Sequence, residues 1–157
     1  MVTKSLNQRC ALVMIADGFN EIEAVVILSK LRQAGLCAKS VGLTSGMISG
    51  AHGILIMPDF TVTDLYQRLD IGLINLVVLP GEEYSLSKLE PDPRVHRLLR
   101  QVFDQGGFIA TCGKGLDMLK AILAPHELGD EETRVLVWSS LGEPIEVFAG
   151  NLVRSMG

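Results

Sequence analysis

The chain has 157 residues, of which 48% are hydrophobic and 20% are charged. This length and balance fit one domain spanning residues 1–157 with a sizeable core, and they exclude an intrinsically disordered chain. The formal charge of −4, from 14 basic and 18 acidic residues, argues against a nucleic-acid-binding surface, which needs clustered lysine and arginine.

Neither a membrane segment nor a cysteine framework is evident. No apolar run reaches the ~18 residues that a membrane-spanning helix needs, and the first residues do not resemble a secretory signal. The three cysteines, Cys10, Cys37 and Cys112, lie far apart in the sequence. Their odd number and wide spacing predict neither a disulfide framework nor a zinc cluster. We therefore expect a cytoplasmic protein with no membrane partner, no metal and no other cofactor.

The first half of the chain alternates short apolar runs with amphipathic segments. Residues 10–15 predict a buried strand, and a helix follows with Asn20 as its N-cap and Gly35 at its end. Residues 37–43 predict a second strand. Residues 46–57 contain two apolar stretches around a glycine-containing turn, so we expect a small β-hairpin there.

The second half continues this alternation. Its predicted elements are, in order, a short helix at 63–68, a strand at 74–79, a polar loop at 82–91, a helix over 95–103, a strand at 108–111, a helix at 116–123, a strand at 134–138 and a final helix from Pro144. Fully apolar strands joined by helices indicate a mostly parallel sheet covered on both faces. The fold class is therefore α/β, a three-layer sandwich with its functional residues beyond the carboxyl ends of the strands.

Cys112 is the strongest candidate for chemistry. It falls between a predicted strand and a predicted helix, and its neighbours Ala110, Gly113 and Gly115 are small. A nucleophile on a sharp strand-to-helix turn needs small neighbours because the backbone folds back on itself. The helix N-terminus would also favour the thiolate and lower the thiol pKa. The alternative is an unreactive core cysteine before a glycine turn.

Glu21 and Glu23 follow the first predicted strand and so belong to the same rim of the sheet. A protonated carboxyl group near a thiol can donate a hydrogen bond to the thiolate and lower the thiol pKa further. The alternative is a solvated helix start whose charges suit the helix dipole.

Two other interpretations have less support. Gly113, Lys114 and Gly115 at a helix start suggest an anion site, but the full phosphate-loop spacing is absent. Asp17, Asp59 and Lys114 each follow a strand, as in a phospho-receiver domain. The first strand is not followed by the acidic pair of such domains, so this interpretation rests on fold analogy alone.

Several segments, taken in order, resemble the ThiJ/PfpI family of the class I glutamine amidotransferase-like superfamily. These segments are residues 11–23, 31–35, 58–59, 77–81, 107–112, 126–129 and 135–156. The resemblance covers nearly the whole chain. It implies a flavodoxin-like sheet, a homodimer, and a reactive Cys112 whose partner is Glu23, with Glu21 the less favoured match. It also implies either glyoxalase-, deglycase- or hydrolase-like activity, with small reactive carbonyls as one substrate class, or a redox-responsive or chaperone-like role.

The oxyanion-binding segments depart from the family pattern. The family usually has Pro-Gly-Gly after its fourth parallel strand, whereas Gly81 is followed here by Glu82. Gly81 and Gly113 remain candidate backbone donors to an oxyanion, but Glu82 adds negative charge where charge would develop. Lys114 stands where the elbow usually has a small residue. Either the turn is shifted, or Lys114 points outward and modulates the thiolate by stabilising it.

The family's histidine partner is a further departure. It normally lies after the elbow helix, but residues 129–133 contain no histidine, and the chain is short for the family. We expect that His52, His96 and His126 do not replace it, since catalysis requires hydrogen-bond reach. A conventional Cys–His hydrolase is therefore not predicted.

Two functions remain open, and the sequence does not decide whether the protein is an enzyme. The first is a redox-responsive thiol or a glyoxalase- or deglycase-type activity on small carbonyls, carried by Cys112 and Glu23. The second is a non-catalytic family member retained for partner binding or a chaperone-like role. Ile22, Val25 and Val26 form an apolar patch beside the core stripe of the first helix, which indicates either deeper burial or a dimer interface.

Overall fold

The computed structural model describes residues 8–123, 134–138 and 144–156, apart from the side chains of residues 112 and 113. Six strands form a parallel sheet in the order β5-β2-β1-β6-β7-β8, and β3 and β4 pair as a separate antiparallel hairpin. The strands are β1 (Cys10–Ile15), β2 (Cys37–Gly42), β3 (Ile48–Ser49), β4 (Leu55–Ile56), β5 (Phe60–Thr61), β6 (Ile74–Leu79), β7 (Phe108–Cys112) and β8 (Val135–Trp138).

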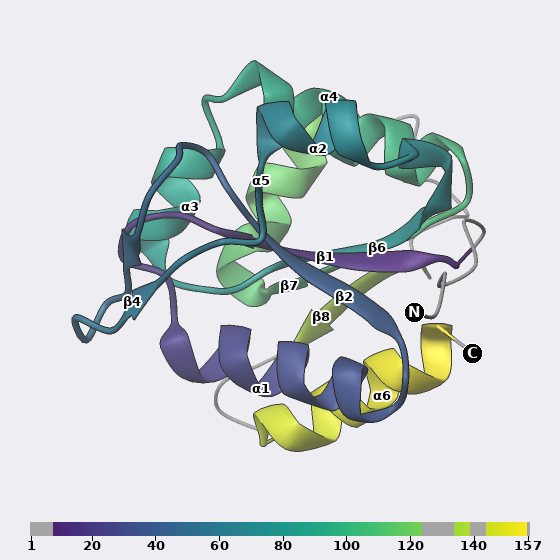
Figure 1. Cartoon of the computed structure of the whole chain (residues 1–157), viewed down its shortest axis with the longest axis horizontal. Helices are drawn as coiled ribbons and strands as arrows, with labels where there is room; N and C mark the ends of the chain where they lie inside the picture. Colours follow the sequence, from purple (N-terminus) through teal and green to yellow (C-terminus); the bar gives the residue numbers. More distant parts are fainter. Residues whose placement is uncertain (1–7, 124–133, 139–143, 157) are drawn as a thin grey trace.

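Helices cover both faces of this sheet, with α1 and α6 packed together on one face and α2, α4 and α5 on the other (Figure 1). The helices are α1 (Glu21–Gln33), α2 (Val62–Arg68), α3 (Glu83–Leu89), α4 (Pro93–Asp104), α5 (Gly113–Leu123) and α6 (Ile145–Met156), with one 3-10 turn at Ile71–Leu73. The predicted α/β three-layer sandwich and its hairpin are confirmed.

The core lies between these layers. Every residue of β1 is buried, as are five of the six residues of β6, which explains why both strands are apolar along their length. The apolar stripe predicted for the α4 segment is also buried, from Val95 to Phe103. In the described part of the chain, no helix is both long and apolar enough to cross a bilayer.

The predicted polar loop at 82–91 is wrong in part, because α3 occupies Glu83–Leu89. Only Ser85, Leu86 and Leu89 of this helix are buried. Two leucines three residues apart are too few to produce a recognisable helical period. The edge strand β5 has only two residues, which is too short for a strand to be recognised from the sequence pattern.

Cys10 and Cys37 form a disulfide, so the prediction of no disulfide was wrong. They begin the neighbouring strands β1 and β2 and are register partners, with 4.6 Å between their Cα atoms. That separation lies in the usual range for disulfides. The register that joins them cannot be read from cysteine count or spacing. The disulfide also removes the cysteine argument for a cytoplasmic location, which stays a prediction.

Candidate functional site

The carboxyl ends of the central strands meet the start of α1 at one rim of the sheet. Asn20 caps α1 there, and its Oδ1 accepts a hydrogen bond from the Glu23 backbone N–H at 3.0 Å. Its Nδ2 donates to Glu82 Oε1 at 3.2 Å. One amide side chain therefore joins the first turn of α1 to the segment that follows β6.

The Glu23 carboxylate lies at the centre of this rim. Its Oε2 accepts a hydrogen bond from the Gly81 N–H at 2.7 Å, and its Oε1 accepts one from Trp138 Nε1 at 3.1 Å. The donors come from the loop after β6 and from the end of β8. The Glu23 carboxylate is thus fixed by hydrogen bonds from two separate segments, as expected of a preorganised site residue.

Burial raises the pKa of Glu23 above its usual value. The hydrogen bonds from Gly81 and Trp138 oppose this by favouring the charged form, as does the positive charge of Lys114, whereas the negative charge of Glu82 adds to the increase. The net direction is upward, so this carboxyl group holds its proton more readily than an exposed glutamate.

The strand-to-helix junction predicted around Cys112 is present in the backbone. β7 ends at Cys112, α5 begins at the next residue, and Cys112 is the register partner of Trp138. A Cβ atom at Gly115 would lie 1.9 Å from Thr111 Oγ1, so this position excludes a side chain. The need for a small residue is confirmed at Gly115, while the reactivity of Cys112 stays a prediction.

The other predicted site residues are placed as follows. The Gly81 N–H, expected to face an oxyanion, already donates to Glu23. Glu82 is partly buried and precedes α3, and Lys114 is exposed in the first turn of α5. Gly113 is the first residue of α5, where backbone N–H groups have no partner within the helix.

Glu21 contributes to a different structure. Its carboxylate is only 4% exposed and accepts hydrogen bonds from the N–H groups of His52 at 2.8 Å and Ile54 at 3.2 Å. It also contacts His52 Nδ1 at 3.1 Å. A Cβ atom at Gly50 would lie 2.3 Å from the Glu21 side chain, so only glycine fits there. Glu21 anchors the β3–β4 hairpin to the start of α1.

We predict that acid weakens this anchor. Burial raises the pKa of Glu21, but hydrogen bonds from Ile54 and His52 lower it more strongly, from 4.5 to about 2. Because the folded-state pKa is the lower one, the stabilisation is complete above pH 4.5 and is lost as the pH falls towards 2. Amide hydrogen exchange of Ile54 should accelerate over this window relative to amides of β6.

The matched variants are Glu21→Gln, which cannot ionise, and Glu146→Gln on the exposed start of α6. Glu21→Gln should show fast exchange at Ile54 at neutral pH and lose the acid dependence. Glu146→Gln should behave as the unmodified protein. Unchanged exchange at Ile54 in Glu21→Gln would contradict the anchoring role.

Comparison with known proteins identifies the family of the chain. The family model described as "DJ-1/PfpI family" matches residues 9–133. The chain belongs to the DJ-1/PfpI family. The predicted resemblance to ThiJ/PfpI proteins is therefore confirmed.

Relatives within the family are distant in sequence. The chain is 29% identical over 112 residues to the Parkinson disease protein 7 homolog of Danio rerio, covering 71% of this chain and 58% of that protein. It is 26% identical over 160 residues to protein dj-1beta of Drosophila melanogaster, covering 95% of this chain and 81% of the relative. The match therefore spans less than two thirds of the zebrafish protein's length.

Solved structures of DJ-1 proteins share the fold. The crystal structure of Drosophila melanogaster DJ-1beta superposes with a TM-score of 0.80 at 20% identity, covering 95% of this chain and 90% of that one. Oxidized Toxoplasma gondii DJ-1 gives a TM-score of 0.77 at 16% identity, with 94% and 90% covered. At these identities the similarity shows the fold alone.

The described histidines are engaged away from Glu23. The ring of His52 contacts Glu21, and His96 Nε2 contacts the backbone carbonyl of Glu90. His126 and the segment predicted to lack the family histidine fall at 124–133, outside the described residues. No group of three potential metal-ligating His, Cys, Asp or Glu residues forms within the described ranges.

Trp138 contacts the candidate site although its sequence context did not predict it there. It is 3% exposed, packs on Phe148 at 4.8 Å between ring centroids, and donates its indole N–H to Glu23. The sequence feature that could have indicated Trp138 is its position at the carboxyl end of the last predicted strand, because ligands bind beyond the carboxyl ends of such strands. Its bond to Glu23 depends on β8 lying beside β7, which the sequence does not show.

Proposed function

We propose that this protein is a cysteine-dependent DJ-1/PfpI member in which Cys112 reacts with small electrophiles, either oxidants or reactive carbonyls, with Glu23 as its acid–base partner. The observation that carries this proposal is the fixed, partly buried Glu23 carboxyl group, bonded to the side chain of the residue paired with Cys112. A carboxyl group that retains its proton can stabilise a neighbouring thiolate and protonate a reacting oxygen.

For a carbonyl substrate, the chemistry is addition of the thiolate. The Cys112 sulfur forms a bond to the carbonyl carbon, and the electron pair of the C=O bond moves to oxygen. Protonated Glu23 supplies the proton and gives a hemithioacetal, and the resulting carboxylate can accept a proton in the next step. Because the Gly81 N–H is bonded to Glu23, we assign the donation to the oxygen to the N–H of Gly113, the first residue of α5.

The decisive experiment is a thiol titration. The alkylation rate of Cys112 with iodoacetamide should reach half its maximum well below pH ~8.5, the ordinary pKa of a cysteine thiol. Alkylation should be followed by peptide mass spectrometry, which separates Cys112 from the other two cysteines. A midpoint at the ordinary value would overturn the proposal.

The second candidate is a non-catalytic member that uses the fold to bind partners. The Gly81 N–H is occupied, and Glu82 adds negative charge at the same rim, held there by Asn20. Both features disfavour stabilisation of an oxyanion. Methylglyoxal turnover that disappears in Cys112→Ser would exclude this candidate.

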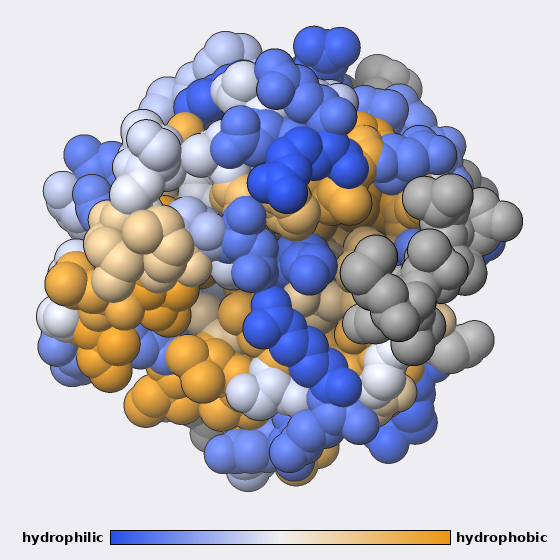
Figure 2. Space-filling model, in the orientation of Figure 1, coloured by the Kyte–Doolittle hydropathy of each residue, from blue (hydrophilic) through white to orange (hydrophobic). Residues whose placement is uncertain are grey.

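We further propose that the protein is a homodimer. On the start of α1, Ile22 and Val25 are 65% and 46% exposed, so the predicted alternative of deeper burial is wrong for these two residues, whereas Val26 is partly buried against the core. On and beside the hairpin, Met47, Ile54, Leu55 and Met57 are each more than half exposed. Figure 2 shows apolar side chains gathered over these elements. An apolar surface shared by two elements is typical of a protein interface.

A single charge on α1 should disrupt this dimer. Val25→Asp is expected to weaken self-association at least about 100-fold, because an unpaired carboxylate would be buried. Val147→Asp is the matched control, since Val147 is also a half-exposed valine on a helix, at 50% exposure. Sedimentation equilibrium should give a monomer only for Val25→Asp, and equal behaviour of the two variants would reject this interface.

A further inference from the structure

The Cys10–Cys37 disulfide lies at the end of the sheet opposite the Glu23 rim. The two cysteines are the first residues of β1 and β2, whereas the candidate site begins beyond the last residue of β1. Six strand residues separate the two ends, a length of roughly 20 Å at about 3.3 Å per residue. The Cys10–Cys37 pair is therefore distant from the candidate site, and an inference about this pair does not depend on the function proposed for Cys112.

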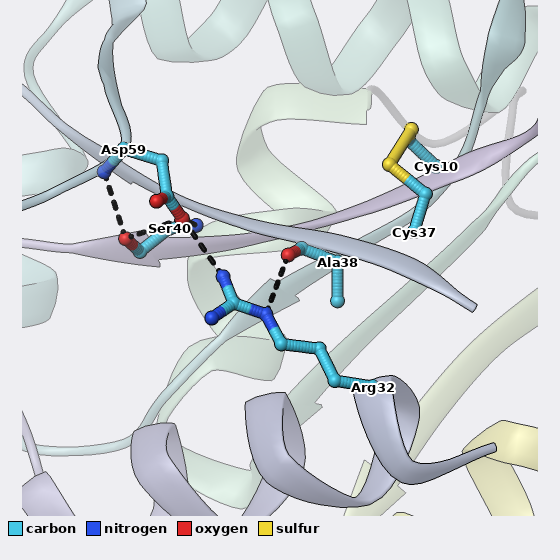
Figure 3. Close-up of polar contacts among 6 residues, drawn as sticks. All are labelled: Cys10, Arg32, Cys37, Ala38, Ser40 and Asp59. Atoms are coloured by element: carbon cyan, nitrogen blue, oxygen red, sulfur yellow. Dashed lines mark hydrogen bonds and ion pairs between the residues drawn. A yellow bond between two sulfur atoms is a disulfide. The ribbon is translucent and has the colours of Figure 1, made fainter. Parts of the chain in front are cut away.

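We propose that Cys10–Cys37 is a reversible thiol-exchange site, which a low-molecular-weight thiol opens by forming a mixed disulfide with Cys37. The pair would make the protein responsive to the balance of thiols and disulfides in its surroundings. The two sulfur atoms and their neighbours are drawn in Figure 3.

The two cysteine residues differ in exposure. Cys10 is only 6% exposed, whereas Cys37 is partly exposed at the end of the α1–β2 turn. Because an attacking thiolate must approach a sulfur directly, attack falls on Cys37 and Cys10 leaves. Cys10 Sγ lies 3.7 Å from the backbone carbonyl of Gln8, so the released thiol has an acceptor for its proton already in place.

Reduction of the disulfide proceeds in two thiol–disulfide exchange steps. The first thiolate forms a bond to Cys37 Sγ, the Cys10–Cys37 bond breaks, and the Cys10 thiolate takes a proton from water. A second thiolate attacks the outer sulfur of the mixed disulfide and releases the Cys37 thiolate, which also takes a proton from water. The protein gains two electrons and two protons, and two small thiols are oxidised to their disulfide.

The fold holds β2 in place without this bond. β1 and β2 pair along their whole length, from Cys10 opposite Cys37 to Ile15 opposite Gly42. Opening the disulfide therefore leaves the backbone ladder of hydrogen bonds between the strands intact.

Side chains also close the outer edge of β2, as Figure 3 shows. Arg32 Nε donates to the Ala38 carbonyl at 2.9 Å, and its Nη2 contacts Asp59 Oδ2 at 2.9 Å. The same Asp59 oxygen accepts the Ser40 N–H at 2.8 Å, and the Asp59 N–H donates to Ser40 Oγ at 3.0 Å. These bonds satisfy backbone groups of β2 that the short strand β5 does not reach.

Reduction should therefore loosen the protein locally and not unfold it. The loosened parts are the residues just before β1 and the turn between α1 and β2. After reduction they stay joined by the hydrogen bond from Gln8 Nε2 to the Gly35 carbonyl at 3.2 Å. The disulfide closes a loop with a sequence separation of 27. Its loss should lower the melting temperature by about 5–15 °C, since cross-links stabilise mainly by restricting the unfolded chain.

The test uses the full chain carrying Cys112→Ser, purified without reductant, so that only this pair reacts. The folded protein is equilibrated in glutathione buffers of increasing reducing power, quenched with N-ethylmaleimide, and analysed by intact mass. We expect no label under oxidising conditions and two labels, appearing together, in millimolar reduced glutathione. The reduced protein should keep its circular dichroism spectrum and show the lower melting temperature.

Single variants test the direction of attack. With Cys10→Ser added to the Cys112→Ser chain, the remaining Cys37 should take up one glutathione from oxidised glutathione about tenfold faster than Cys10 does when Cys37→Ser is added instead. A disulfide that resists glutathione in the folded protein but is reduced in urea would overturn the proposal in favour of a static cross-link. Two free thiols in the protein as purified, or equal uptake by the two single variants, would also overturn it. The labelling of the Cys112→Ser chain remains decisive if a single variant does not fold.

Discussion

Replacing Cys112 with serine should abolish methylglyoxal turnover, lowering kcat/KM by at least about 10³-fold. A serine hydroxyl is not ionised near neutral pH, and a Glu23 that starts out protonated, as proposed, cannot deprotonate it, whereas a cysteine thiol with a lowered pKa is largely thiolate. The measurement is the loss of methylglyoxal at saturating and subsaturating concentrations, which separates kcat from KM.

The matched control is Cys37→Ser, which removes a thiol far from the Glu23 rim. It should retain turnover although it loses the disulfide. A melting curve of each variant separates loss of chemistry from loss of fold. Turnover that survives in Cys112→Ser would show that the activity does not use this cysteine, and turnover absent from the unmodified chain would favour the partner-binding candidate.

The sequence predicts the layers of this fold because its strong signals are long. The apolar run at β1 and the five-residue stripe on α4 each extend over a whole element and predict the element correctly. The signals that failed are short or depend on distant neighbours. α3 buries only Ser85, Leu86 and Leu89, and the Cys10–Cys37 disulfide requires the register of β1 with β2.

The same distinction applies to the site. The Cys112 junction and the two glutamates after β1 were predicted because the carboxyl ends of parallel strands meet at one rim, whereas the choice of Gly81 and the preference for Glu23 came from the family resemblance. Glu21 was grouped with them, but its carboxylate is directed to the hairpin, where it binds His52 and Ile54. Residues two apart in the first turn of a helix point in different directions, so position after the strand could not by itself separate these two glutamates, and only the family resemblance favoured Glu23.

Changing Glu23 should alter the pKa of the Cys112 thiol, and the sign of that change reveals the protonation state of the carboxyl group. If Glu23 is protonated and donates to the thiolate, Glu23→Ala removes a stabilising bond and raises the thiol pKa. Turnover at neutral pH should then fall by about 10²-fold. Glu23→Gln keeps an N–H donor and should have the smaller effect. Glu146→Ala, on the exposed start of α6, is the control for loss of one negative charge.

If Glu23 is instead ionised, its charge opposes the thiolate, and both Glu23→Ala and Glu23→Gln should lower the thiol pKa. That result would contradict the proposed role of Glu23 as a hydrogen-bond donor. Trp138→Phe is an independent test of whether Glu23 is protonated or ionised. It removes the donor to Glu23 Oε1, which raises the pKa of Glu23 and favours the protonated carboxyl group. A protonated Glu23 predicts that Trp138→Phe leaves the Cys112 thiol pKa low, whereas an ionised Glu23 predicts a fall as the negative charge is lost.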